Sequence, residues 1–258
     1  MNKNQNPSDM NLKSVLNFRD IGGIVSDGDK KIKDGIIFRS ANPDGISKGD
    51  IKKLHLLNIR TIIDLRAPHE HKRQKRSIDH IDRLSLPLDF AQITREKFKP
   101  LLNKKNSEVM ISDISNSLYL EILDATQQMF KDVMEVLLSS ERCPVLIHCQ
   151  AGKDRTGIIC ALILLALGAE RQLIIDDFLK SNDALLPFFK KMVLRRKILS
   201  FGFFPSRAIL FAITVRKRNI ESVLDRIADH FGGIEAFLKD SGVDTSRLTE
   251  LKKKLFVK

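Results

Sequence analysis

The chain has 258 residues, of which 43% are hydrophobic and 29% are charged. That composition is typical of a soluble globular protein with room for one large domain or two small ones. Its 13 Gly and 8 Pro exclude a collagen-like or broadly disordered chain, and its 3 Cys exclude a disulfide scaffold and Cys-rich metal fingers. The formal net charge of +12 favours an anionic partner: nucleic acid, a phospholipid surface or a phosphorylated substrate.

Neither a secretory signal nor a membrane span is predicted. The first 20 residues are polar and lack the apolar stretch of a secretory signal. The longest apolar run, residues 158–168, is shorter than the roughly 20 residues that a membrane span needs. We therefore expect a buried helix there and a cytoplasmic protein.

Strand and helix patterns alternate along the first part of the chain. Residues 36–39 (IIFR) predict a short strand, and Ser47 followed by Asp50 is typical of a helix start. A buried strand is predicted at 59–65 (IRTIIDL) and a short extended segment at 84–88. This interleaving predicts an α/β fold, in which helices cover a sheet.

The second part of the chain continues the alternation and then becomes helical. An amphipathic stripe at 129–137 predicts a core helix, and residues 144–148 (PVLIH) predict a buried strand that runs into the apolar helix. Two further helices are expected at 220–231, where Gly residues end the pattern, and at 248–256.

Residues 184–220 hold most of the net charge. This segment has nine basic residues, six Phe and no acidic residue, so it contributes +9 of the +12. One interpretation is a helical lid whose phenylalanines pack on the core and whose charges are solvated. The other is a surface that docks on anionic lipid, with Phe inserted among the headgroups. Nucleic acid is the weakest candidate, because no binding motif accompanies the charge.

The strongest chemical signal is HCQAGKDRTG, residues 148–157, here called the signature loop. A loop between a strand and a helix turns backbone N–H groups inward and adds the positive helix end, which makes a site for a phosphate-sized dianion. Arg155 can grip two phosphate oxygens with its planar fork. The positive electrostatic field of these groups also stabilises a Cys149 thiolate. We therefore expect the thiolate to attack phosphorus and to form a covalent cysteinyl phosphate. The expected substrate-binding residues are Gln150, Ala151, Gly152, Lys153, Asp154 and Arg155.

Two neighbours of the nucleophile have predicted supporting roles. Thr156 is expected to donate its hydroxyl to the Cys149 sulfur and so improve the leaving group when water breaks the intermediate. His148 has two interpretations: it orients the loop by hydrogen bonds, or it is a core histidine with no part in the chemistry.

The signature loop resembles that of the cysteine-dependent protein tyrosine phosphatase superfamily. Three more segments, NFRDIGG at 17–23, FRSANP at 38–43 and TIIDLR at 61–66 with Glu70 beyond, resemble one bacterial branch. That branch is the family of mycobacterial protein tyrosine phosphatase B and related lipid and dual-specificity phosphatases.

The resemblance implies a central, mainly parallel sheet flanked by helices. It places a phosphatase domain at 17–258, with a helical lid at 184–220, after a flexible segment at 1–16. The implied activity is hydrolysis of phosphotyrosine, with dual specificity extending to phosphoserine, phosphothreonine and phosphoinositides, and without a metal or cofactor. Relatives that act inside host cells leave open an export route that does not use a Sec signal.

The general acid has more than one candidate. The resemblance maps this role onto Asp154, immediately before the signature Arg, or onto Asp64 in the strand-end DLR segment. The helix terminus and Arg155 favour the ionised form of Asp154, and a bound dianion would oppose that effect. We prefer Asp154 to Asp64, with Asp89 third, and a helix-capping role for Asp154 is the structural alternative.

Lys153 bears on the class of substrate. A Lys within the loop also occurs in the phosphoinositide phosphatase called the phosphatase and tensin homologue, where the loop is similar. The resemblance implies contact with a second phosphate on an inositol ring, and the alternative is that Lys153 only adds positive potential. The 17–23 segment, Arg66 and Glu70 are expected to support the site rather than to contact substrate.

Overall fold

The computed structural model describes residues 10–26, 30–71, 78–104 and 107–257. The greater part of the expected flexible segment, residues 1–9, lies outside them. In the rest of that segment Leu12 and Val15 are buried in a hydrophobic cluster, so the chain is packed on the core before residue 17.

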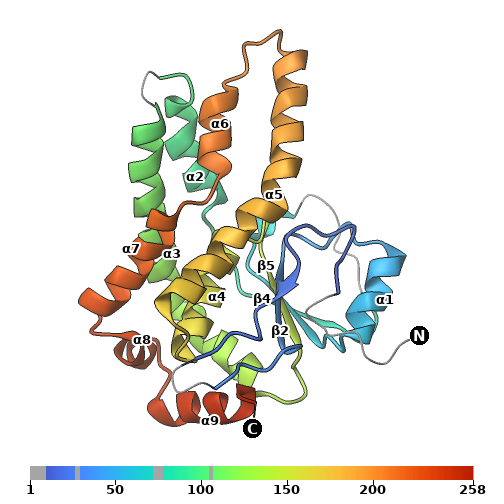
Figure 1. The fold of residues 1–258 in the computed structure, drawn as a ribbon, viewed down its shortest axis with the longest axis vertical. Helices are drawn as coiled ribbons and strands as arrows, with labels where there is room; N and C mark the ends of the chain where they lie inside the picture. The colour runs from blue at the N-terminus through green and yellow to red at the C-terminus, as the bar shows by residue number, and fades with distance from the viewer. Residues whose placement is uncertain (1–9, 27–29, 72–77, 105–106, 258) are drawn as a thin grey trace.

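A five-stranded sheet forms the centre of the fold (Figure 1). The strand order is β1-β2-β5-β3-β4, in which β5 pairs in parallel with β2 and β3, β4 is parallel to β3, and β1 is antiparallel to β2. The prediction of a mainly parallel α/β sheet flanked by helices is confirmed. The bounds are β1 (Arg19–Asp20), β2 (Ile37–Ser40), β3 (Thr61–Asp64), β4 (Asp82–Ser85) and β5 (Val145–His148).

Side-chain alternation along the central strand β5 divides the core into two layers. Val145 and Ile147 belong to the larger hydrophobic cluster, whereas Leu146 belongs to the smaller one that includes Leu54 of α1 (Lys48–Leu56). Successive strand residues point to opposite faces, so a strand buried on both faces reads as an apolar run. Figure 1 shows α1 on one side of the sheet and the larger group of helices on the other.

Three helices cover the face of the sheet that carries the larger hydrophobic cluster. Their apolar residues determine that they pack there. They are α3 (Ser107–Leu138), α4 (Arg155–Ala166) and the first part of α5 (Arg171–Leu199), and α3 contacts both α4 and the C-terminal helices. α4 is the apolar helix of the sequence pattern, and nearly all of its residues are buried.

The expected helix starts and stops are largely found. The Ser47 hydroxyl caps α1 by accepting from the Asp50 N–H at 3.1 Å. The pattern at 220–231 lies mostly in α7 (Lys217–Asp229), and the two glycines after the pattern both have positive φ values, 79° and 117°. The extended segment expected at 84–88 begins two residues earlier, in β4. The remaining elements are α2 (Ala91–Phe98), α6 (Ser206–Ile213), α7 (Lys217–Asp229), α8 (Ile234–Asp240), α9 (Thr245–Leu255) and the 3₁₀ turns η2 (Pro68–Glu70) and η3 (Lys99–Leu101).

The basic segment at 184–220 does not begin at an element boundary. It starts within the long α5, continues through a connection at 200–205 and includes α6, which contacts α3 and α5. Figure 1 shows the end of α5 and the connection to α6 projecting away from the sheet along the long axis of the molecule. Within the described part of the chain, no helix is both long and apolar enough to cross a membrane.

Candidate active site

The signature loop begins at His148, the last residue of β5, and runs into α4, whose first residue is Arg155. In the sheet register His148 stands opposite Ser40 of β2 and Asp64 of β3. Because the carboxyl ends of parallel strands meet at one edge, the FRS and DLR segments are brought to either side of the loop. This edge is where α/β sheets bind their ligands.

Gly152 allows the loop to approach β2 closely. Its φ is +67°, and a Cβ built there would lie 2.1 Å from the Ser40 carbonyl oxygen. The Gly152 carbonyl accepts from Asn17 Nδ2 at 2.8 Å and from Arg39 Nη2 at 2.8 Å. In a trans peptide the C=O and the next N–H point in opposite directions, so these two donors also fix the direction of the Lys153 N–H.

A buried ion cluster stands behind these donors. Asp177 of α5 accepts from Arg39 Nη1 at 2.6 Å and from Arg19 Nε at 2.7 Å. Burial raises the pKa of Asp177, but the two guanidinium groups outweigh burial and lower it overall. These contacts are those of a scaffold, as expected for the 17–23 segment. Asp177 was missed, because an Asp in an amphipathic helix gives no distinct sequence signal.

Arg155 is held by Glu70. Its Nη1 and Nη2 donate to the two Glu70 oxygens at 2.5 and 2.8 Å, and Nη1 also donates to the Leu88 carbonyl at 3.0 Å. Burial lowers the pKa of Arg155, but Glu70 and the neighbouring Cys149 raise it overall. The fork is therefore charged and fixed close to Cys149, and Glu70 acts directly on the signature Arg.

Cys149 is 2% exposed, and its two expected helpers differ in the structure. The Thr156 hydroxyl is buried and makes no hydrogen bond within the described residues, so the expected donation to the Cys149 sulfur is not seen. His148 Nδ1 lies 3.2 Å from the Cys149 carbonyl, and Nε2 lies 3.6 Å from Asp64 Oδ2. Burial lowers the pKa of His148 to about 4, so the neutral ring holds the loop.

Asp154 lies at the mouth of the site with two partners. It accepts from the Tyr119 hydroxyl and from Lys153 Nζ, the latter at 2.8 Å, and its side chain is 34% exposed. The capping alternative is not realised, because the Asp154 side chain makes no cap hydrogen bond to α4. Burial raises its pKa, but Lys153, Tyr119 and Arg155 outweigh burial and lower it.

Tyr119 was missed by sequence analysis, although it is the one Tyr in the chain. Tyr119 falls in the apolar pattern of α3, which is typical of a core residue. That pattern gives no sign that the Tyr119 hydroxyl reaches Asp154. Burial raises the pKa of Tyr119 well above its ordinary value, and the Asp154 charge adds to that shift. Tyr119 is therefore a hydrogen-bond donor to an ionised carboxylate.

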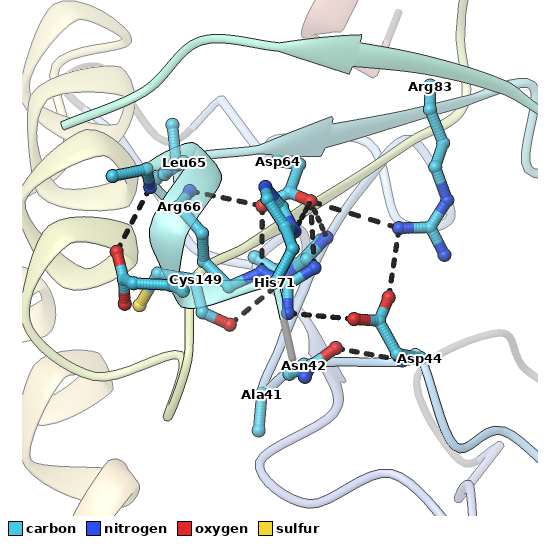
Figure 2. A network of polar contacts seen from close by, with 12 residues as sticks. Ala41, Asn42, Asp44, Asp64, Leu65, Arg66, His71, Arg83 and Cys149 are labelled. Carbon is cyan, nitrogen blue, oxygen red and sulfur yellow. Dashed lines mark hydrogen bonds and ion pairs between the residues drawn. The ribbon is translucent and has the colours of Figure 1, made fainter. Parts of the chain in front are cut away.

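Asp64 has a different environment from Asp154. Its side chain is fully buried, and Arg66 donates to both of its oxygens at 3.0 and 2.9 Å. Arg83 lies 3.9 Å and His71 lies 4.0 Å from Oδ2. Figure 2 shows the Asp64 carboxylate at the centre of this network. Burial raises its pKa, but the Arg66 hydrogen bonds and the other cations hold it well below its usual range. Asp89, the third candidate, pairs with His69 at 3.6 Å near the surface.

A second cation, Arg216, interacts with the charge of the acid candidate. Arg216 stacks on the Phe211 ring, with 4.1 Å between the guanidinium carbon and the ring centroid, and its Nη1 donates to the Phe211 carbonyl. Its Nε and Nη2 are buried without a hydrogen-bond partner among the described residues. Burial lowers the pKa of Arg216, and the nearby Tyr119 and Asp154 oppose that effect. The sequence marked Arg216 only as one of nine basic residues.

A hollow adjoins the loop at Gln150, which is exposed. Its volume is about 590 Å³, enough for a side chain of a bound substrate. It is lined by His69, Glu70, Ala91, Gln92, Arg95, Glu96 and Gln150.

The chain is similar to bacterial proteins that are named as phosphatases. A Cupriavidus necator protein named as a tyrosine-protein phosphatase is 24% identical over 246 residues, covering 95% of this chain and 88% of the relative. The triple specificity protein phosphatase PtpB of Mycobacterium tuberculosis is 27% identical over 277 residues, covering 93% and 96% of the two chains. Among solved structures, TpbA of P. aeruginosa is similar with a TM-score of 0.33 and 21% identity over 56% of this chain and 68% of that one.

A family model covers nearly the whole chain. The model of the tyrosine phosphatase family matches residues 10–257. The match includes the signature loop, the arginines that hold it and the basic segment at 184–220. The chain therefore belongs to the tyrosine phosphatase family.

Proposed function

We propose that this chain is a cysteine-dependent phosphatase that hydrolyses phosphotyrosine in proteins through a cysteinyl-phosphate intermediate. The observation that carries the proposal is the fixed signature loop: Gly152 is locked against β2, and Arg155 is locked by Glu70 beside Cys149. The loop N–H groups and the Arg155 fork together enclose a phosphate-sized anion, whose charge grows on the equatorial oxygens as the ester bond breaks.

The chemistry proceeds in two steps. The Cys149 thiolate attacks phosphorus, a sulfur–phosphorus bond forms, and the phosphorus–oxygen ester bond breaks as the leaving oxygen takes a proton from Asp154. Water then attacks the phosphorus, Asp154 takes the proton of the water, and the sulfur–phosphorus bond breaks to release phosphate and the thiolate. In this second step the buried Thr156 hydroxyl, which has no described partner, is free to donate to the departing sulfur.

Asp154 fits the acid role better than Asp64. A bound phosphate dianion raises the pKa of Asp154, whose partners at rest are one hydroxyl and one ammonium group. Asp64 is fully buried under two hydrogen bonds from Arg66, and this pairing resists protonation. We assign Asp64 to holding Arg66.

Dual specificity, including phosphoinositides, is the finer part of the proposal. Lys153 and Arg216 bring two cations to the side of Asp154, and the Arg216 Nε and Nη2 atoms have no described partner. Buried donors that lack partners favour a ligand that supplies acceptors, and a second phosphate on an inositol ring does so. The M. tuberculosis relative, described as a triple specificity phosphatase, is consistent with a broad substrate range.

The test is hydrolysis of a phosphotyrosine peptide with and without a chelator. We expect turnover that a chelator leaves unchanged, that Cys149→Ser abolishes and that the matched variant Cys143→Ser retains. Normal turnover in Cys149→Ser would remove the proposed nucleophile.

The acid and the substrate range have separate tests. Asp154→Asn should slow an alkyl phosphate by about 10²–10⁴-fold and an activated aryl phosphate far less, whereas equal losses on both would exclude Asp154 as the acid.

In a panel of phosphopeptides and mono-, bis- and trisphosphorylated inositol lipids, Arg216→Gln should reduce turnover of the multiply phosphorylated lipids selectively.

A further inference from the structure

The end of the α5–α6 projection exposes large apolar side chains. Within residues 194–203, here called the tip, Phe201 is 91% exposed and Phe203 is 89% exposed. Leu199 and Ile198 precede them at 78% and 66% exposure. The interpretation that the phenylalanines of this segment pack on the core is therefore wrong at the tip, although Phe211 does pack against a small cluster with α3. Contiguous exposed apolar residues at one end of a fold mark an interaction surface.

The cations around the tip have no counterions among the residues that the structure describes. Lys190, Lys191, Arg195 and Lys197 are exposed, and none of them forms an ion pair with any carboxylate in the described ranges. Arg196 lies over the Phe204 ring at 5.8 Å rather than beside an acid. A partner with negative charge is thus complementary to this surface.

A shallow apolar groove runs along the same part of α5. Its volume is about 350 Å³. Phe188, Met192 and Leu199 provide apolar lining, and Lys191, Arg195 and Arg196 provide positive charge. Apolar lining with cations at its margin matches a lipid, which presents an acyl chain next to an anionic headgroup.

We propose that the tip docks this protein on the surface of a membrane rich in anionic phospholipids, with Phe201 and Phe203 inserted at the level of the headgroups. Arg195, Arg196 and Lys197 then lie within reach of the lipid phosphates, where each cation strengthens binding about fivefold. A second copy of the chain is a poorer occupant, because the basic segments of two copies would repel each other. The tip is also the far end of a projection, which suits shallow insertion (Figure 1).

Docking at the tip is separate from the chemistry of the site. Ser181 of α5 accepts from Asn17 at 3.4 Å and so lies next to the signature loop. Counted along α5, Leu199 at the tip lies about 27 Å from Ser181, and the tip contributes no residue to the signature loop. The proposal therefore does not depend on a lipid substrate.

The test is sedimentation of the full chain with vesicles of phosphatidylcholine alone or of phosphatidylcholine with phosphatidylserine. We expect binding to the anionic vesicles only and loss of binding at high salt. Phe201→Ser/Phe203→Ser should reduce the bound fraction at least tenfold, as should charge reversal to Glu at Arg195, Arg196 and Lys197.

Matched controls come from α1 and its flank. Leu56→Ser removes an apolar side chain that is 61% exposed, and reversal of Lys48, Lys52 and Arg60 changes the net charge equally. Both controls should bind as the parent chain does, and all variants should keep phosphatase activity on a soluble substrate. Unchanged binding in the tip variants would overturn the proposal. A parent chain that is dimeric by light scattering, with monomeric Phe variants, would assign the tip to self-association instead.

Discussion

The signature loop and the tip use positive charge in opposite ways. Around the loop, Arg39, Arg66 and Arg155 are buried and each donates to named carboxylate or carbonyl oxygens. At the tip, Arg195 and Lys197 are exposed and have no carboxylate partner within the described chain. Fixed donors can hold one small anion in one geometry, whereas exposed flexible cations adapt to a surface of many anions. The difference separates the expected effects of mutation: the loop should be sensitive to shape, and the tip only to charge and apolarity.

Among the paired changes in the loop and at the tip, the largest effect is expected at Arg155. In Arg155→Lys the charge remains, but the fork that bonds both Glu70 oxygens is lost. We expect kcat/KM to fall about 10²–10³-fold with little change in folding. At the tip the equivalent change, Arg195→Lys, should leave both turnover and vesicle binding within about twofold, since exposed cations act as point charges. A fall of about 10²–10³-fold in Arg195→Lys, or an unchanged kcat/KM in Arg155→Lys, would contradict the proposed difference between the loop and the tip.

A glycine in the loop and a glycine at the tip allow a direct comparison of how closely the two regions are packed. Gly152 and Gly202 both have positive φ, but a Cβ at Gly152 meets the Ser40 carbonyl at 2.1 Å and a Cβ at Gly202 meets nothing within 4 Å. Gly152→Ala should lower the free energy of unfolding by about 3 kcal/mol or more, whereas Gly202→Ala should lower it by about 1 kcal/mol. Denaturant unfolding measures both values. Equal losses would show that the loop is not tightly locked against β2.

Because His148 is buried beneath the signature loop, it should make the stability of the protein depend on pH. The side chains of the tip cannot have this effect. Burial lowers the pKa of His148 from 6.5 to about 4, so between these values the unfolded chain binds the extra proton. Stability therefore falls as pH drops from 6.5 toward 4, by about 3 kcal/mol from this group. Unfolding of the parent chain and of His148→Asn over this range gives the measurement. A parallel decline in both proteins would mean that His148 is not the cause.

The smallest effect is expected at Tyr119. Its hydroxyl stabilises ionised Asp154, so Tyr119→Phe should raise the pKa of Asp154. Because the acid must be protonated to act, the falling limb of the pH–rate profile should move to higher pH by about one unit. An unshifted limb in Tyr119→Phe would argue that Asp154 does not limit the rate as an acid.

The sequence predicted those parts of the fold and site that are local in the chain. Strand β5, the loop and α4 are continuous from residue 145 to residue 166, and their apolar runs and single motif could be read directly. Cys149, Arg155, Asp154 and Lys153 were named from that motif. The mainly parallel order of the sheet came from the resemblance to a family rather than from periodicity.

The parts that were missed are contacts between distant segments. Asp177 reaches Arg39 across 138 positions, and Glu70 reaches Arg155 across 85. Tyr119 sits in the apolar face of a helix, which concealed its role. The exposure of Phe201 and Phe203 was also hidden, because a Phe-rich segment is more often core. Only the tertiary structure shows that the described part of the chain leaves these two side chains uncovered.

The most direct test of the central claim is a crystal structure of the full chain soaked with tungstate, which mimics the phosphoryl group. We predict one tungstate inside the signature loop, within hydrogen-bond distance of the backbone N–H groups of residues 150–155 and of the Arg155 fork, with the Cys149 sulfur directly behind it. Crystals of active protein in which tungstate occupies other sites while the loop stays empty would contradict the account.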